Sequence, residues 1–134
     1  MIEREYIIDD YVQVGKKKFM LNMNTYRNAC YHLLSDAKIN FKNQLLLTYP
    51  ELLKIKAHQL KLSYIIFPHN AGLFDTRNIT TVVDKFFLDA LVTAGTIPDD
   101  NYLIVQYDAP DTVFNGIPSS EQKNKKILIK CKFF

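Results

Sequence analysis

One stretch of the sequence constrains the fold more than any other, because it predicts a strand, a helix and a second strand in succession. Residues 60–67 alternate apolar with polar side chains and then become apolar throughout, which is typical of a strand that ends buried on both faces. Residues 79–94 repeat apolar side chains at spacings of three and four, which predicts a helix with a wide apolar face. We expect Asn78 to cap this helix, Gly95 to end it and residues 102–107 to form the next strand.

The flanking segments add further strands. Residues 6–14 are β-prone and are broken by Asp9 and Asp10, which indicates a strand or a hairpin. The segment that follows the lysines at 16–18 is also extended, and its asparagines are suited to capping a helix. Residues 126–133 alternate apolar with polar side chains and predict the final strand.

A second long helix is predicted from about Tyr26 to Leu47, because apolar side chains again recur three and four residues apart. Its stripe consists of Tyr26, Cys30, Leu33, Ala37, Phe41 and Leu45. The expected fold class is therefore α/β (α+β), with a mixed sheet and two main helices packed on it.

Length and composition indicate a globular protein. The 134 residues suit a single domain, and 48% of them are hydrophobic. No apolar run approaches the ~20 residues that cross a bilayer. The N-terminus, MIEREYIIDD, is acidic where a signal peptide would be basic and then apolar, so we expect a cytoplasmic protein. Cys30 and Cys131 have no disulfide or zinc-site spacing, and we expect both to be small buried residues.

The positive charge is modest in total but clustered. The net charge is +3, and Lys16, Lys17 and Lys18 are consecutive. A second cluster near the C-terminus consists of Lys123, Lys125, Lys126, Lys130 and Lys132. Such clusters can neutralise DNA phosphates. The alternative is that they form a solvated turn and an edge strand protected by lysines, and charge alone favours this alternative over DNA binding.

Five acids lie in or beside the predicted helix at 79–94. Asp75 precedes it, Asp84 and Asp89 are on it, and Asp99 and Asp100 follow it. Magnesium prefers several carboxylate oxygens on a fixed frame, and a bound metal can activate water for phosphodiester cleavage. Lys85 would add a positive charge near a scissile phosphate. The alternative is a helix cap, a turn and a surface ion pair between Lys85 and Asp89, and spacing alone favours that alternative.

The order of these residues resembles a known family. The chain has Asp75-Thr76-Arg77-Asn78, then Lys85, Asp89-Ala90-Leu91, Gly95 and Asp99-Asp100. An earlier segment reads Leu21-Asn22-Met23-Asn24-Thr25-Tyr26-Arg27. Together they are similar to the RusA family of Holliday junction resolvases, which phages and prophages often carry. The part from 75 to 100 carries most of the likeness.

The resemblance implies a metal-dependent endodeoxyribonuclease that cuts four-way DNA junctions as a homodimer in a bacterial host cell. It implies Mg²⁺ or Mn²⁺ as cofactor, with no organic cofactor and no membrane partner. The catalytic residues implied are Asp75, Asp100 and Lys85, and the implied metal ligands are Asp75, Asp99 and Asp100. The DNA-binding residues that we expect are Lys16, Lys17, Lys18, Arg27 and Arg77.

Two features depart from this expectation. The family has a second loop acid where this chain has Arg77, and an arginine cannot bind a metal. The alternative is thus a nuclease-dead relative that binds DNA or protein as a regulator. In addition, Asp75 and Asp100 flank a helix of ~16 residues, which would separate them by roughly 24 Å in one subunit. A shared metal site would therefore need either a strongly tilted helix or acids from two subunits.

Overall fold

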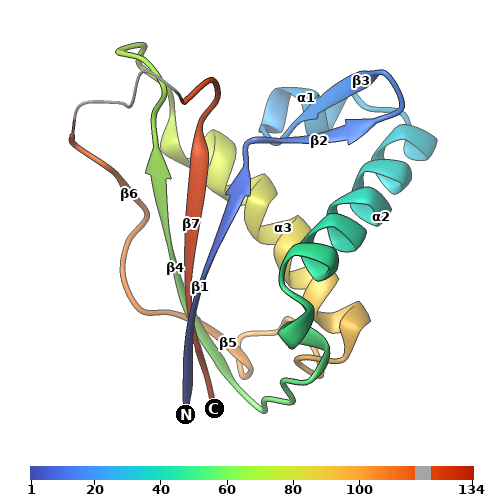
Figure 1. Ribbon diagram of the computed structural model, residues 1–134, viewed down its shortest axis with the longest axis vertical. Coiled ribbons are helices and arrows are strands. Elements are labelled where there is room, and N and C mark those ends of the chain that lie inside the picture. Colours follow the sequence, from blue (N-terminus) through green and yellow to red (C-terminus); the bar gives the residue numbers. More distant parts are fainter. Residues whose placement is uncertain (117–121) are drawn as a thin grey trace.

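The computed structural model describes residues 1–116 and 122–134, and its centre is a mixed five-stranded sheet (Figure 1). Its strands are β1 (Ile2–Asp9), β7 (Lys126–Phe133), β4 (Leu60–Phe67), β5 (Val105–Tyr107) and β6 (Thr112–Val113). β7 lies between β1 and β4 and is antiparallel to both, whereas β5 and β6 run parallel to β4. The predicted fold class is confirmed, and the bounds predicted for β4 and β7 are those found.

A separate hairpin follows β1, formed by β2 (Tyr11–Val14) and β3 (Lys17–Met20). Asp10 makes the break between sheet and hairpin. Its side chain is buried, its backbone N–H donates to Lys125 at 3.2 Å, and its carbonyl accepts from Leu21 at 2.8 Å. The break predicted at Asp9 and Asp10 is therefore present, but residues 6–14 do not form a hairpin, because β1 pairs with β7 and β2 pairs with β3. The β2–β3 hairpin is tied through Asp10 to the start of β7.

The connection from β4 to β5 is α3 (Thr76–Ala94), which covers the sheet face that carries Tyr64 and Ile129 (Figure 1). Gly95 ends this helix as predicted, with a φ of 78° in the left-handed region. The predicted cap is wrong, because α3 begins three residues earlier. Asp75 caps it by accepting from the Arg77 N–H, while the Asn78 side chain bonds elsewhere.

The long helix predicted at 26–47 is two helices, α1 (Met23–Asn28) and α2 (Tyr31–Thr48). Ala29 and Cys30 between them have extended backbones, so the apolar stripe continues across a break in the helix. Cys30 is consequently exposed rather than buried, whereas Cys131 is buried as expected. Asn22 caps α1 by accepting from the Thr25 N–H at 2.8 Å.

Two smaller elements complete the chain. A short 3-10 helix, η1 (Pro50–Leu53), follows α2. β5 starts at Val105 rather than at Tyr102, because Ile104 and Val105 both donate to the Asn101 carbonyl and close a turn. Among the described residues, no helix is long and apolar enough to cross a membrane.

Candidate functional site

The acids predicted to bind a metal lie at the two ends of α3. Asp75 precedes the helix, whereas Asp99 and Asp100 follow its C-terminal glycine. A 19-residue helix separates them, and at 1.5 Å per residue it spans about 28 Å. One subunit therefore does not bring Asp75 to Asp100. Within residues 1–116 and 122–134, no three His, Cys, Asp or Glu side chains are grouped so that they could hold a metal ion.

Two basic residues, Arg77 and Lys125, lie near the Asp75 end of α3. Asp75 is exposed, and its Oδ1 accepts from the Arg77 backbone N–H at 3.1 Å. The Lys125 ammonium lies 4.9 Å from the ring centre of Phe74, the residue before Asp75. Arg77 is exposed in the first turn of α3, where the helix dipole favours anions and disfavours cations. An anionic ligand would therefore be well accommodated beside Arg77.

The Asp99–Asp100 end is a turn. The Asp100 N–H donates to Asp99 Oδ1 at 2.7 Å, and the Asn101 side chain donates to Asp99 Oδ2 at 3.0 Å. These two hydrogen bonds hold the pKa of the Asp99 carboxyl below its usual value, and the bond from the Asp100 backbone has the larger effect. Both aspartates are exposed. Asp99 is thus held in a defined orientation with its charge on the surface.

Asp89 brings a third acid to this end. With Asp99 and Asp100 it lines a shallow cavity of about 360 Å³ between α2 and α3. Lys38 of α2 also lines this cavity and pairs with Asp89 Oδ2 at 3.2 Å. The prediction of an ion pair between Lys85 and Asp89 within α3 is therefore wrong. Asp89 joins the two helices instead, because it faces α2.

The segments at 21–27 and 75–100, which are far apart in sequence, contact each other in space. The Asn78 side-chain oxygen accepts from the Met23 N–H at 3.1 Å, which joins the start of α3 to the start of α1. Further along α3, the exposed Lys85 holds its ammonium 5.8 Å from the ring centre of Tyr26. Arg27 is exposed in the last turn of α1. Lys85 and Arg27 therefore project from neighbouring helices.

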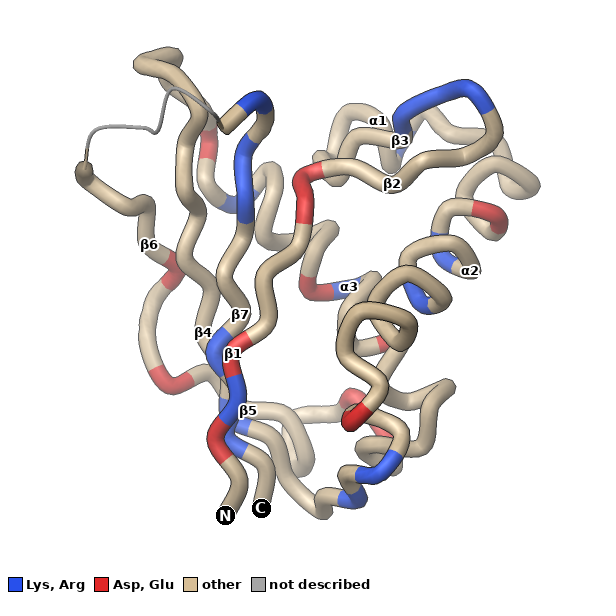
Figure 2. The backbone as a smooth tube through the Cα atoms, viewed as in Figure 1, with Lys and Arg blue, Asp and Glu red and all other residues tan. Residues whose placement is uncertain are grey.

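Part of the clustered lysines lies at the same end of the molecule as the start of α3, whereas Lys130 and Lys132 lie further along β7, towards the start of β4. Figure 2 shows basic residues at the turn between β2 and β3 and in the segment that enters β7. Lys16, Lys17 and Lys18 are all exposed, and Lys18 lies 4.4 Å from the Tyr11 ring centre. Lys126 is paired with Asp9. The surface here is basic, although it includes acids.

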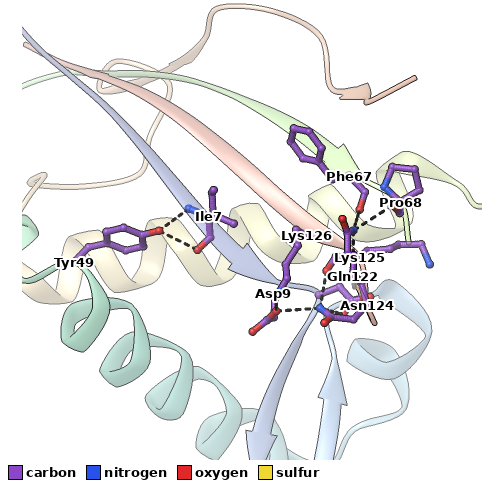
Figure 3. A network of polar contacts seen from close by, with 10 residues as sticks. Ile7, Asp9, Tyr49, Phe67, Pro68, Gln122, Asn124, Lys125 and Lys126 are labelled. Carbon is purple, nitrogen blue, oxygen red and sulfur yellow. Dashed lines mark hydrogen bonds and ion pairs between the residues drawn. The ribbon is translucent and has the colours of Figure 1, made fainter. Parts of the chain in front are cut away.

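A hydrogen-bond network fixes the segment that enters β7 (Figure 3). The Gln122 amide donates to the carbonyls of Phe67 at 2.8 Å and Pro68 at 3.2 Å, beyond the end of β4. The Asn124 amide donates to Asp9 at 3.0 Å, at the end of β1. These bonds join the segment before β7 to the ends of β4 and β1. The backbone of residues 123–125 is therefore fixed in position.

The structure also shows a site that sequence reasoning missed. Asp84 accepts hydrogen bonds from the hydroxyls of Tyr64 and Tyr107, so that it links α3 to β4 and β5. Burial raises the pKa of Asp84 above its usual value, although the two tyrosine hydrogen bonds oppose that rise. Asp111 lies nearby and accepts from the Thr80 hydroxyl at 2.7 Å. The signal in the sequence was that Asp84 is an acid on the side of an apolar helix that is expected to face the sheet.

No known family profile matches the chain, and no curated protein matches it in sequence. Membership of the RusA family therefore stays a prediction from the quoted residues and their order along the chain.

Proposed function

We propose that the protein is a homodimeric, metal-dependent endonuclease that acts on branched DNA in the manner of RusA resolvases. The observation that supports this most is the contact between the two RusA-like segments, made by Asn78 with Met23 and by Lys85 with Tyr26. These pairs lie more than fifty residues apart in sequence. A shared site explains why both segments occur in one chain.

The basic end of the molecule is the proposed DNA surface. Its cations are Lys16, Lys17, Lys18, Arg27, Arg77, Lys123 and Lys125. Arg77 is exposed in the first turn of α3, where the free backbone N–H groups of the helix add to its attraction for a phosphate. Contacts of this kind make affinity fall steeply with salt.

Cleavage would take place at sites shared between two subunits. A two-fold axis near the middle of α3 brings the N-terminal end of each helix to the C-terminal end of its partner. Asp75 of one subunit and the partner's Asp99 and Asp100 would then hold Mg²⁺ or Mn²⁺, which supplies an activated water. Tyr102 and Leu103, 81% and 64% exposed, follow Asp100 and offer apolar area to a second subunit.

Lys85 has a distinct place in this arrangement. It lies ten residues after Asp75, about 15 Å along the helix, so it is near the proposed two-fold axis rather than beside a metal. Its ammonium would contact phosphates between the two cleavage sites. A symmetric pair of sites suits a four-way junction, in which two equivalent strands are cut.

The test is cleavage of a labelled four-way junction with magnesium, with manganese and with EDTA. We expect paired nicks that need the metal, that are lost in Asp100→Asn and that persist in Asp36→Asn, an exposed acid on α2. Cleavage that persists in EDTA or in Asp100→Asn would overturn the proposed site.

A second candidate is a nuclease-dead relative that binds junctions or a protein partner as a regulator. Arg77 beside Asp75 favours it, as does the lack of a three-carboxylate group in the described part of the chain. This protein would bind the junction tightly and leave it uncut in both metals. Either activity would operate in the cytoplasm of a bacterial cell, on host or phage DNA.

A further inference from the structure

Leu73 is the most exposed large apolar side chain among the described residues, with a relative accessibility of 102%. It lies two residues before Asp75, in the loop of residues 68–75 that leads from β4 to α3. Single exposed leucines are common on protein surfaces. Leu73 differs from those because the chain around it is held in place on both sides.

The loop of residues 68–75 has a defined shape. The Asn70 side chain accepts from the Gly72 N–H at 2.9 Å, which closes a tight turn just before Leu73. A Cβ at Gly72 would lie 3.0 Å from the Asn70 oxygen, so glycine gives this turn its room. After Leu73, the ring of Phe74 is half-buried beneath Lys125. Leu73 is therefore presented outward between two anchored residues.

The base of the loop is also anchored and carries more apolar surface. The Gln122 amide donates to the carbonyls of Phe67 and Pro68, from which the loop departs (Figure 3). The Phe114 ring lies 4.8 Å from the Phe67 ring and is 46% exposed. An exposed ring of this kind can stack on a nucleic-acid base.

Cations flank this apolar surface. Arg77 follows the loop, Lys125 covers Phe74, and Lys123 is exposed on the anchored segment that enters β7. This mixture of apolar and cationic side chains complements DNA, whose bases offer apolar faces while its backbone carries negative charge. A protein partner of high negative charge would satisfy the cations but would leave Leu73 and Phe114 without apolar contacts.

We propose that the loop of residues 68–75 is a wedge that inserts Leu73 into the base stack at the branch point of the DNA. Apolar side chains inserted between base steps unstack them, and the cost is lowest where stacking is already interrupted, as it is at a branch point. Lys123, Lys125 and Arg77 would hold the adjoining phosphates, and Phe114 would stack on a base that the wedge has unstacked. This inference rests on the proposed binding of branched DNA and identifies the feature of that DNA that is recognised.

The test uses 2-aminopurine, whose fluorescence rises when it is unstacked, placed either at the branch point of a four-way junction or within one arm. Wild type should raise the branch-point signal several-fold and leave the arm signal unchanged. Leu73→Ala should abolish the rise at saturating protein, whereas Leu73→Phe should retain it. The matched control is Leu47→Ala, because Leu47 is 78% exposed on α2.

The outcomes separate this inference from the function on which it rests. Junction binding by wild type without a fluorescence rise would overturn the wedge alone. An equal rise with Leu73→Ala would do the same, because another group would then unstack the bases. Failure of wild type to bind the junction at low salt would overturn both.

Discussion

The Asn78 side-chain oxygen accepts a hydrogen bond from the Met23 backbone N–H at 3.1 Å. This bond joins the first turn of α3 to the first residue of α1. Arg77 lies in that turn of α3, and Arg27 lies in the last turn of α1. The bond therefore fixes two of the expected DNA-binding residues relative to each other.

Asn78→Ala should loosen α1 from α3. The Met23 N–H loses its partner, so we expect the free energy of unfolding to fall by about 1 kcal/mol. Junction binding should weaken because Arg27 is less well positioned. Urea unfolding and a binding titration measure the two effects, with Asn24→Ala, an exposed position on α1, as control. Unchanged stability and affinity would show that the contact contributes nothing.

Arg77→Asp should raise the rate of four-way junction cleavage at saturating protein, although the loss of a phosphate-binding cation should weaken junction binding. The substitution adds a carboxylate two residues from Asp75, and an acid in the first turn of α3 should also stabilise the helix by about 0.3–1 kcal/mol. Single-turnover cleavage in magnesium measures the first effect and thermal unfolding the second. Arg77→Ala removes the cation without adding a ligand and should not raise the rate. A slower rate in Arg77→Asp would argue that Arg77 itself serves cleavage.

Asp84→Asn should stabilise the protein increasingly as pH rises. The folded-state pKa of Asp84 is raised above its usual value because burial disfavours the charged carboxylate. The stability that the raised pKa of Asp84 gives to the folded protein is complete below the unfolded-state pKa and is lost as pH rises through the folded-state pKa. The asparagine variant does not titrate, so its stability relative to wild type rises over the same range. Urea unfolding of both proteins from about pH 3.5 to about pH 7.5 tests this. A stability difference independent of pH would contradict it.

Gly95→Ala should destabilise the protein by about 1–2 kcal/mol, because alanine is strained in the left-handed region. The φ of 78° requires that conformation, and a Cβ would also meet the Lys56 ammonium at 3.2 Å. Gly95→Asn should cost less, since asparagine tolerates the left-handed region better. Thermal unfolding compares the two variants, and an equal loss would point to the Lys56 contact instead.

Sequence patterns predicted the elements whose signals are local. The alternation in β4 and β7 and the glycine after α3 gave correct bounds, because each follows from a few adjacent residues. The break at Ala29 and Cys30 was missed, since apolar spacing reports burial rather than backbone continuity. A continuous stripe can therefore run over two helices.

The candidate site was predictable only where it follows from helix geometry. Counting residues along α3 separates Asp75 from Asp100, and the structure agrees. The contact of Asn78 with Met23 and the two tyrosines on Asp84 depend on tertiary packing, which no local pattern reports. The pairing of Asp89 with Lys38 depends on how α2 lies against α3.

The most direct test of the central claim is to mix subunits of Asp75→Asn with subunits of Asp100→Asn and measure junction cleavage. If each site takes Asp75 from one subunit and Asp100 from the other, every mixed dimer regains one intact site, and random exchange restores about a quarter of wild-type nicking. Asp75→Asn mixed with the double variant should restore none. A mixture as inactive as its two parents, while wild type cleaves, would contradict the shared site.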